Sequence, residues 1–152
     1  MIAIGSDHGG FDLKNEIVRF MSEKGFMVKD YGTYDCSSVD YPDYGLAVAE
    51  AVKSEECDKG IVICGTGIGI SISANKVPGI RAALCTDGYM ARMSREHNDA
   101  NILALGGRVI GVGLALEIVD IWLKTDFLGG RHKIRVDKIS GIEKKYLKAG
   151  EE

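Results

Sequence analysis

The chain has 152 residues, with 19 Lys or Arg, 22 Asp or Glu and a formal net charge of −3. This length predicts one domain over residues 1–152, and this charge provides no basic field for nucleic acid or an anionic membrane, so we expect neither as a partner. Glycine is the unusual component: 20 residues, against the roughly 10 that average usage of ~7% would supply. An apolar content of 45% with only two prolines excludes disorder as the reason, so glycines mark turns, close packing or ligand approach to the main chain.

Short apolar runs alternate with amphipathic stretches along the whole chain. Strands are predicted at residues 2–4, 26–28, 60–64, 80–84 and 101–105. Helices are predicted from the apolar spacing at residues 13–21 and 47–52, from the glycine loop to about 76, at 89–97, 113–124 and 131–148. Strands that alternate with helices predict a parallel sheet covered by helices, in a single α/β layer domain.

The four cysteines, at positions 36, 57, 64 and 85, form no CxxC pair and have no histidine cluster around them. This spacing argues against a zinc site and against a disulfide framework. The N-terminus lacks the pattern of a signal peptide, and Glu117 and Asp120 interrupt the longest apolar run, so no membrane span is expected. We therefore expect a cytoplasmic protein with reduced thiols and no metal.

The candidate site residues follow the predicted strands. Ligands of open parallel sheets bind beyond the carboxyl ends of the strands. The first strand is followed by Asp7-His8-Gly9-Gly10, the third by Gly65-Thr66-Gly67-Ile68-Gly69 and the fifth by Gly106-Gly107-Arg108. We expect these segments to converge on one edge of the sheet.

The glycine loop at 65–69 connects a strand to a helix, where unpaired backbone N–H groups favour an anion. It matches neither the dinucleotide fingerprint nor a Walker loop, so the alternatives are anion binding and a merely tight turn. Cys64 directly precedes this loop. A thiol at a helix N-terminus is more readily ionised and can act as a nucleophile or base, although a buried structural cysteine is the commoner case.

Histidines and arginines supply further candidates. His97 and Asn98 close a predicted helix, where a histidine is either a cap or a proton-transfer group. Arg131 and Arg135 are one helical turn apart, so they repel each other unless an anion such as a phosphate lies between them. The alternative is a solvated basic helix face.

Five motifs in register resemble ribose-5-phosphate isomerase B over residues 1 to about 147. They are Gly5-Ser6-Asp7-His8-Gly9-Gly10-Phe11, Asp40-Tyr41-Pro42, Cys64-Gly65-Thr66-Gly67-Ile68-Gly69, Arg95-Glu96-His97-Asn98 and Gly129-Gly130-Arg131-His132. The resemblance implies a Rossmann-like three-layer sandwich with a five-stranded parallel sheet and a C-terminal helix. It also implies a metal-free enzyme without cofactor that interconverts ribose 5-phosphate and ribulose 5-phosphate in the pentose phosphate pathway, through a cis-enediolate.

The resemblance also implies a role for each candidate residue. Cys64 would be the base, because the branch of the family with a glutamate base carries it just after the loop, where this chain has Ile70, Ser71 and Ile72. Backbone N–H groups of the loop would stabilise the enediolate. Thr66 and His97 would assist ring opening. The remaining contacts to substrate would come from Asp7, His8, Tyr41, Gly65, Gly67, Ile68, Gly69, Asn98, Arg108, Arg131 and Arg135.

Members of this family are dimers or tetramers, so His97, Asn98 and Arg108 are expected to reach into a neighbouring subunit's site. The wider family includes enzymes of galactose 6-phosphate and allose 6-phosphate, and a hexose phosphate is the alternative substrate. A second alternative is a non-catalytic phosphate or nucleotide sensor, which would have no need of Cys64 or His97.

Overall fold

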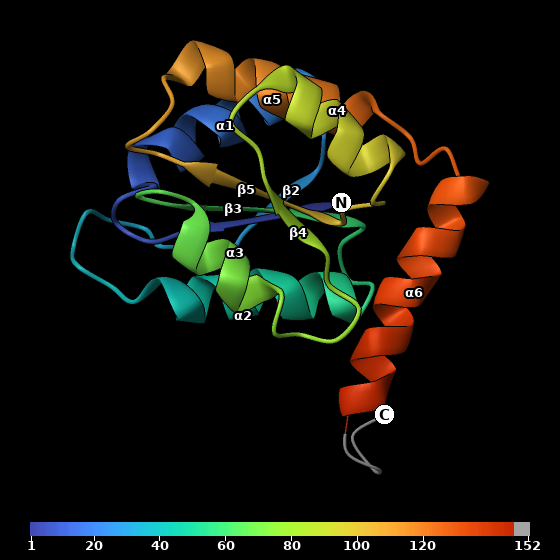
Figure 1. Cartoon of the computed structure of the whole chain (residues 1–152). Helices are drawn as coiled ribbons and strands as arrows, with labels where there is room; N and C mark the ends of the chain where they lie inside the picture. Colours follow the sequence, from blue (N-terminus) through green and yellow to red (C-terminus); the bar gives the residue numbers. More distant parts are fainter. Residues whose placement is uncertain (148–152) are drawn as a thin grey trace.

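A five-stranded parallel sheet forms the centre of the protein in a computed structural model, which describes residues 1–147 (Figure 1). The strand order is β2-β1-β3-β5-β4, and every neighbouring pair is parallel. The elements in chain order are β1 (Ile2–Ser6), α1 (Phe11–Glu23), β2 (Val28–Asp30), α2 (Tyr41–Lys53), β3 (Lys59–Cys64), α3 (Ile68–Ala74), β4 (Ala82–Leu84), α4 (Gly88–Glu96), β5 (Ile102–Gly106), α5 (Val112–Lys124) and α6 (Arg131–Tyr146). The predicted three-layer α/β fold with a C-terminal helix is confirmed.

Two apolar clusters, one on each face of the sheet, hold the layers together. On one face α1 and α5 pack against β1, β3 and β5, with Ile17 and Trp122 fully buried. On the other face α2 and α3 pack against the same strands through Val48 and Ile70. The three central strands are therefore buried on both sides, which explains their continuous apolar sequence.

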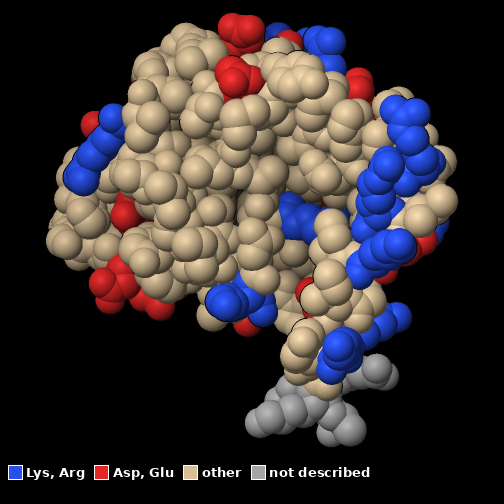
Figure 2. Space-filling view, in the orientation of Figure 1, with Lys and Arg blue, Asp and Glu red and all other residues tan. Residues whose placement is uncertain are grey.

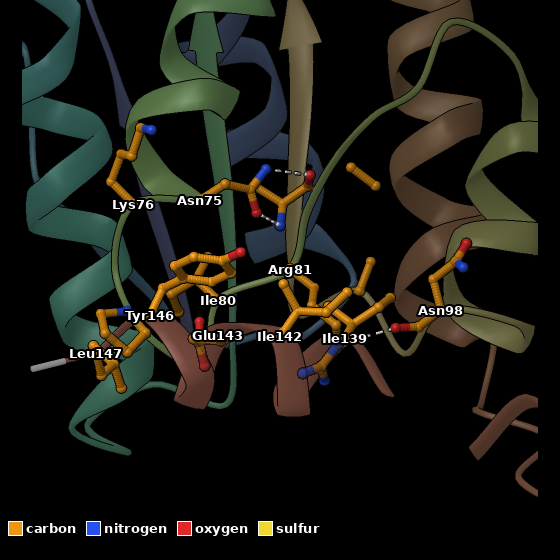
Figure 3. A pocket seen from close by; sticks show the side chains of 14 residues that line it. Asn75, Lys76, Ile80, Arg81, Asn98, Ile139, Ile142, Glu143, Tyr146 and Leu147 are labelled. Carbon is orange, nitrogen blue, oxygen red and sulfur yellow. Dashed lines mark hydrogen bonds between the residues drawn. The ribbon is translucent and has the colours of Figure 1, made fainter. Parts of the chain in front are cut away.

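The predicted starts of two strands are wrong by two residues. Strand β2 begins at Val28 rather than Phe26, because the backbone N–H of Phe26 still donates to Met21 O and ends α1. Strand β4 begins at Ala82 rather than Ile80, because residues 77–80 form a turn. The carboxamide of Asn75 then pairs with both backbone groups of Ala82 at the outer edge of β4 (Figure 3).

Helix α6 stands apart from the layers, at one end of the sheet (Figure 1). Within it only His132 and Val136 are buried, and Lys and Arg side chains run along its outer surface (Figure 2). Its hydrogen-bonded link to the main body is the Glu143 carboxylate, which accepts from Gly79 N at 3.0 Å. Lys148, the predicted end of this helix, lies outside the described residues.

Candidate active site

The carboxyl edge of the sheet brings together three glycine-containing loops, as the sequence predicts. They follow β1, β3 and β5, which are neighbours in the sheet. A Cβ atom on Gly107 would lie 2.7 Å from Gly9 O, and one on Gly9 would lie 3.1 Å from Gly65 N. Side chains at these positions would push the loops apart, so their close approach depends on glycine.

Cys64 ends β3 at the centre of this edge, with 4% of its surface exposed. The backbone N–H of Gly67 donates to Cys64 Sγ at 3.1 Å. Gly67 has a φ of 79°, in the left-handed region, and it precedes α3. This conformation turns the N–H of the loop back toward the sulfur.

The side chains of Asp7 and His8 each accept hydrogen bonds from backbone N–H groups. Asp7 Oδ1 accepts hydrogen bonds from Gly9 N at 2.9 Å and Gly10 N at 3.2 Å, so this carboxylate shapes its own loop. His8 Nδ1 accepts from Val39 N at 3.2 Å. Because Nδ1 is an acceptor, the proton of neutral His8 is on Nε2, which can donate to a ligand.

Tyr41, Thr66 and Arg108 complete the group at the carboxyl edge. Tyr41 is the first residue of α2, and its ring would lie 2.6 Å from a Cβ on Gly69, so the ring covers the glycine loop. Thr66 Oγ1 accepts from Ile68 N at 3.2 Å. The backbone N–H of Arg108 donates to Gly65 O at 2.9 Å. Loop 65–69 therefore has the Tyr41 ring against Gly69 and the Arg108 side chain beside Gly65, while Thr66 and Ile68 are exposed.

The remaining predicted residues form a second group at the opposite, amino edge of the sheet. Helix α4 starts after β4 and returns toward the start of β5, so His97 and Asn98 lie far from Cys64 in the same chain. His97 stacks on His132, with ring centroids 4.1 Å apart and an interplanar angle of 9°. This group lines a cavity of about 450 Å³ whose walls are His97, Asn98, Arg131, His132, Arg135, Val136 and Ile139.

Electrostatically, the second group suits an anion. Burial lowers the pKa of His132 below its ordinary value of 6.5, and the nearby His97, Arg131 and Arg135 act in the same direction. Two arginines and two imidazoles therefore face one small cavity, with Glu96 as the acidic group that acts on His132. An anion bound there would relieve the mutual repulsion of the two arginines.

The structure thus brings Asp7, His8, Tyr41, Cys64, Thr66 and Arg108 together and places His97, Asn98, Arg131 and Arg135 elsewhere in the same chain. His132 is part of the Gly129-Gly130-Arg131-His132 motif, but it was given no role among the expected site residues. Its place in that motif, directly after Arg131, is the signal that could have assigned it one. The stacking on His97 depends on tertiary structure that no local pattern records.

Within residues 1–147, no three His, Cys, Asp or Glu side chains are grouped as metal ligands. The four cysteines all lie in this part of the chain and none is in a disulfide. No helix of the described residues has the length and apolar character needed to cross a membrane.

A family model described as ribose/galactose isomerase matches residues 2–139. The chain belongs to the ribose/galactose isomerase family. The ribose-5-phosphate isomerase B of Clostridium thermocellum is 71% identical and has a TM-score of 0.95, covering 96% of this chain and 99% of that one. The ribose-5-phosphate isomerase B of Escherichia coli is 54% identical over 144 residues, 95% of this chain and 97% of the relative. The resemblance found in the sequence and the isomerase class are confirmed.

The names of other relatives concern the substrate. A galactose-6-phosphate isomerase subunit of Clostridium acetobutylicum is 48% identical over 127 residues, covering 84% of this chain and 73% of the relative. The ribose-5-phosphate isomerase B of Mycoplasma genitalium, solved with bound ribulose 5-phosphate, is 44% identical, with a TM-score of 0.90 and coverage of 95% of this chain and 96% of that one. Members of this isomerase family therefore differ in the length of the sugar.

Proposed function

We propose that this isomerase interconverts ribose 5-phosphate and ribulose 5-phosphate, with Cys64 as the base. The observation that carries this proposal is the position of Cys64 Sγ, 3.1 Å from Gly67 N in a loop of closely packed backbone. Two ribose-5-phosphate isomerases, 71% and 54% identical over nearly the whole chain, support the pentose substrate. The reaction would serve the pentose phosphate pathway in the cytoplasm.

The proposed chemistry moves two protons and needs no other reactant. After ring opening, the Cys64 thiolate takes the proton from C2 of the aldose. The C2–H electron pair forms the C1–C2 double bond while the C1 carbonyl π pair moves onto O1, which gives a cis-enediolate. Backbone N–H groups of the 65–69 loop stabilise the negative oxygen. Return of the proton to C1, with transfer of the hydroxyl proton from O2 to O1, completes the ketose.

The proposed site is shared between two copies of the chain, because one copy has the two groups of residues at opposite edges of its sheet. One copy supplies Asp7, His8, Tyr41, Cys64 and Thr66. The other supplies His97 for ring opening, Asn98 for a sugar contact, and Arg131 with Arg135 for the phosphate. Arg108 lies at the carboxyl edge beside its own Gly65, where it would contact the substrate from the Cys64 side.

Replacing Cys64 tests the assignment of the base. Cys64→Ala should abolish turnover and the exchange of C1 protons of ribulose 5-phosphate with D₂O, which reports enediolate formation alone. Binding of the sugar phosphate, measured by calorimetry, should stay nearly unchanged because the phosphate contacts are remote from the sulfur. A Cys64→Ala enzyme that still exchanges these protons would rule out Cys64 as the base.

A hexose 6-phosphate is the second candidate substrate, favoured by the 48% identity to the galactose-6-phosphate isomerase subunit. Comparing kcat/KM for ribose 5-phosphate, allose 6-phosphate and galactose 6-phosphate, each in the presence of EDTA, separates the two. The pentose should be preferred. Phosphate or nucleotide binding without turnover of any of these sugars would favour a non-catalytic sensor.

A further inference from the structure

The turn that follows α4 has an unusual conformation. It carries His97 and Asn98, and it ends at Asp99, whose φ is 46°. This left-handed region is normally taken by glycine, although aspartate is one of the side chains that adopt it most readily. Hydrogen bonds from Asp99 N to Arg95 O and from Ala100 N to Ser94 O close the turn. Its conformation therefore needs support from outside the turn.

Arg81, just before β4, supplies that support from one side. Its Nε donates to Asn98 O at 3.0 Å (Figure 3). The same Nε donates to Asp99 O at 3.1 Å, and Nη2 donates to Asp99 O at 2.9 Å. The same Nη2 lies 3.4 Å from the Asp99 carboxylate. The guanidinium thus holds two successive carbonyl groups of the turn, for which its rigid planar set of donors is well suited.

Arg95 holds the turn from the other side. Its side chain is buried, and its Nη1 donates to Asp99 Oδ1 at 3.0 Å and to Ala100 O at 2.6 Å. Its Nε donates to Thr125 O at 3.2 Å, in the segment that leads to α6. The Asp99 carboxylate is therefore shared by two arginines, and the turn is connected to the segment before Arg131.

His97 directly precedes the residues that the two arginines hold. With the turn held on both sides, the imidazole of His97 lies parallel to that of His132 and lines the same cavity as Arg131. If the turn were loose, the histidine would lose this fixed orientation toward the cavity. A displacement of a reacting group by about 1 Å can lower the reaction rate about 100-fold.

We propose that Arg81 is a positioning residue, which holds the 97–99 turn so that His97 and Asn98 face the cavity formed with α6. This inference rests on the proposed function, because it gives His97 a part in ring opening. Arg81 touches no substrate. It acts through the backbone of Asn98 and Asp99.

The test is a double-mutant cycle with Arg81→Met and His97→Ala, measured by two assays. Turnover of ribose 5-phosphate should fall about 10- to 100-fold in Arg81→Met, whereas C1 proton exchange of saturating ribulose 5-phosphate, an open-chain sugar, should stay within about twofold of wild type. In the His97→Ala background, Arg81→Met should lower turnover by no more than about a further twofold, because both substitutions impair the same step, ring opening.

Two further variants separate positioning from folding. Arg92 lies on α4 with an exposed side chain, so Arg92→Met is the matched control and should keep full turnover. Asp99→Asn keeps a side chain that accepts the left-handed conformation but removes the shared carboxylate. It should give a smaller loss of turnover with the same preserved exchange, so it tests the proposal even if Arg81→Met does not fold.

The outcomes distinguish this inference from the proposed function. Wild-type turnover in both Arg81→Met and Asp99→Asn, or losses that multiply with that of His97→Ala, would overturn the positioning role alone. A fully active His97→Ala enzyme would instead overturn the role of His97 in the proposed function, and the positioning role with it.

Discussion

At Gly67 both the backbone conformation and the surrounding atoms disfavour any residue with a side chain. Its φ of 79° costs an alanine about 1–2 kcal/mol. A Cβ there would also lie 2.8 Å from Leu105 C and 2.9 Å from Leu105 O, and backbone contacts this short cost about 1–3 kcal/mol to relieve. Gly67→Ala should therefore lower the free energy of unfolding by about 2–5 kcal/mol, a large part of the ~5–15 kcal/mol typical of a domain.

The assay is urea denaturation, with Gly113→Ala in α5 as the matched control. Gly113 lies in a helix, and a Cβ there would meet no side chain or neighbouring element of the described residues within 4 Å, so alanine should be neutral or stabilising by about 0.5–1 kcal/mol. Relief of the clash at Gly67→Ala would also move the N–H of this residue away from Cys64 Sγ. Turnover of the folded fraction should fall about tenfold or more. Equal stability of the two variants, with unchanged kcat, would refute this account of the loop.

Two further predictions concern buried ionisable groups. Lys14 is 1% exposed and paired with Asp30, whose side chain is 31% exposed. Lys14→Met should therefore lower the free energy of unfolding by about 1–3 kcal/mol, less than for a fully buried pair. Lys14→Met combined with Asp30→Asn should recover part of this loss in urea denaturation, and no loss in Lys14→Met would contradict the prediction. The pKa of His132 is lowered in the folded protein, so the unfolded chain binds a proton more readily and stability should fall as the pH drops below about 6.5. Bound inorganic phosphate should raise this pKa in an NMR titration, and an unchanged value would exclude an anion beside His132.

Much of the fold follows from local sequence. The apolar runs of β1, β3 and β5 are long enough to predict buried strands, and their glycine-rich exits fall at one edge because parallel strands share a direction. The starts of β2 and β4 depend instead on tertiary contacts, such as the pairing of Asn75 with Ala82, that periodicity does not record.

The candidate site was only partly predictable for a related reason. Cys64 and its loop are adjacent in the sequence, so their proximity follows directly from the motif. His97 and Arg131 belong to motifs that are equally recognisable in the sequence. Helices α4 and α5, however, run back across the sheet, so these two residues lie at its amino edge. The roles of Arg81 and Asp99 arise from side-chain contacts with the backbone of a turn, which sequence patterns do not show.

Subunit complementation tests the central claim, a site shared between two copies, most directly. Cys64→Ala and Arg131→Ala chains should each be nearly inactive alone, since the first lacks the proposed base and the second lacks a proposed phosphate ligand. When the two are co-expressed and assort at random, half of the dimers are mixed and each mixed dimer has one intact site, so activity should return to about a quarter of wild type. Failure of the mixed dimers to regain activity would contradict a shared site.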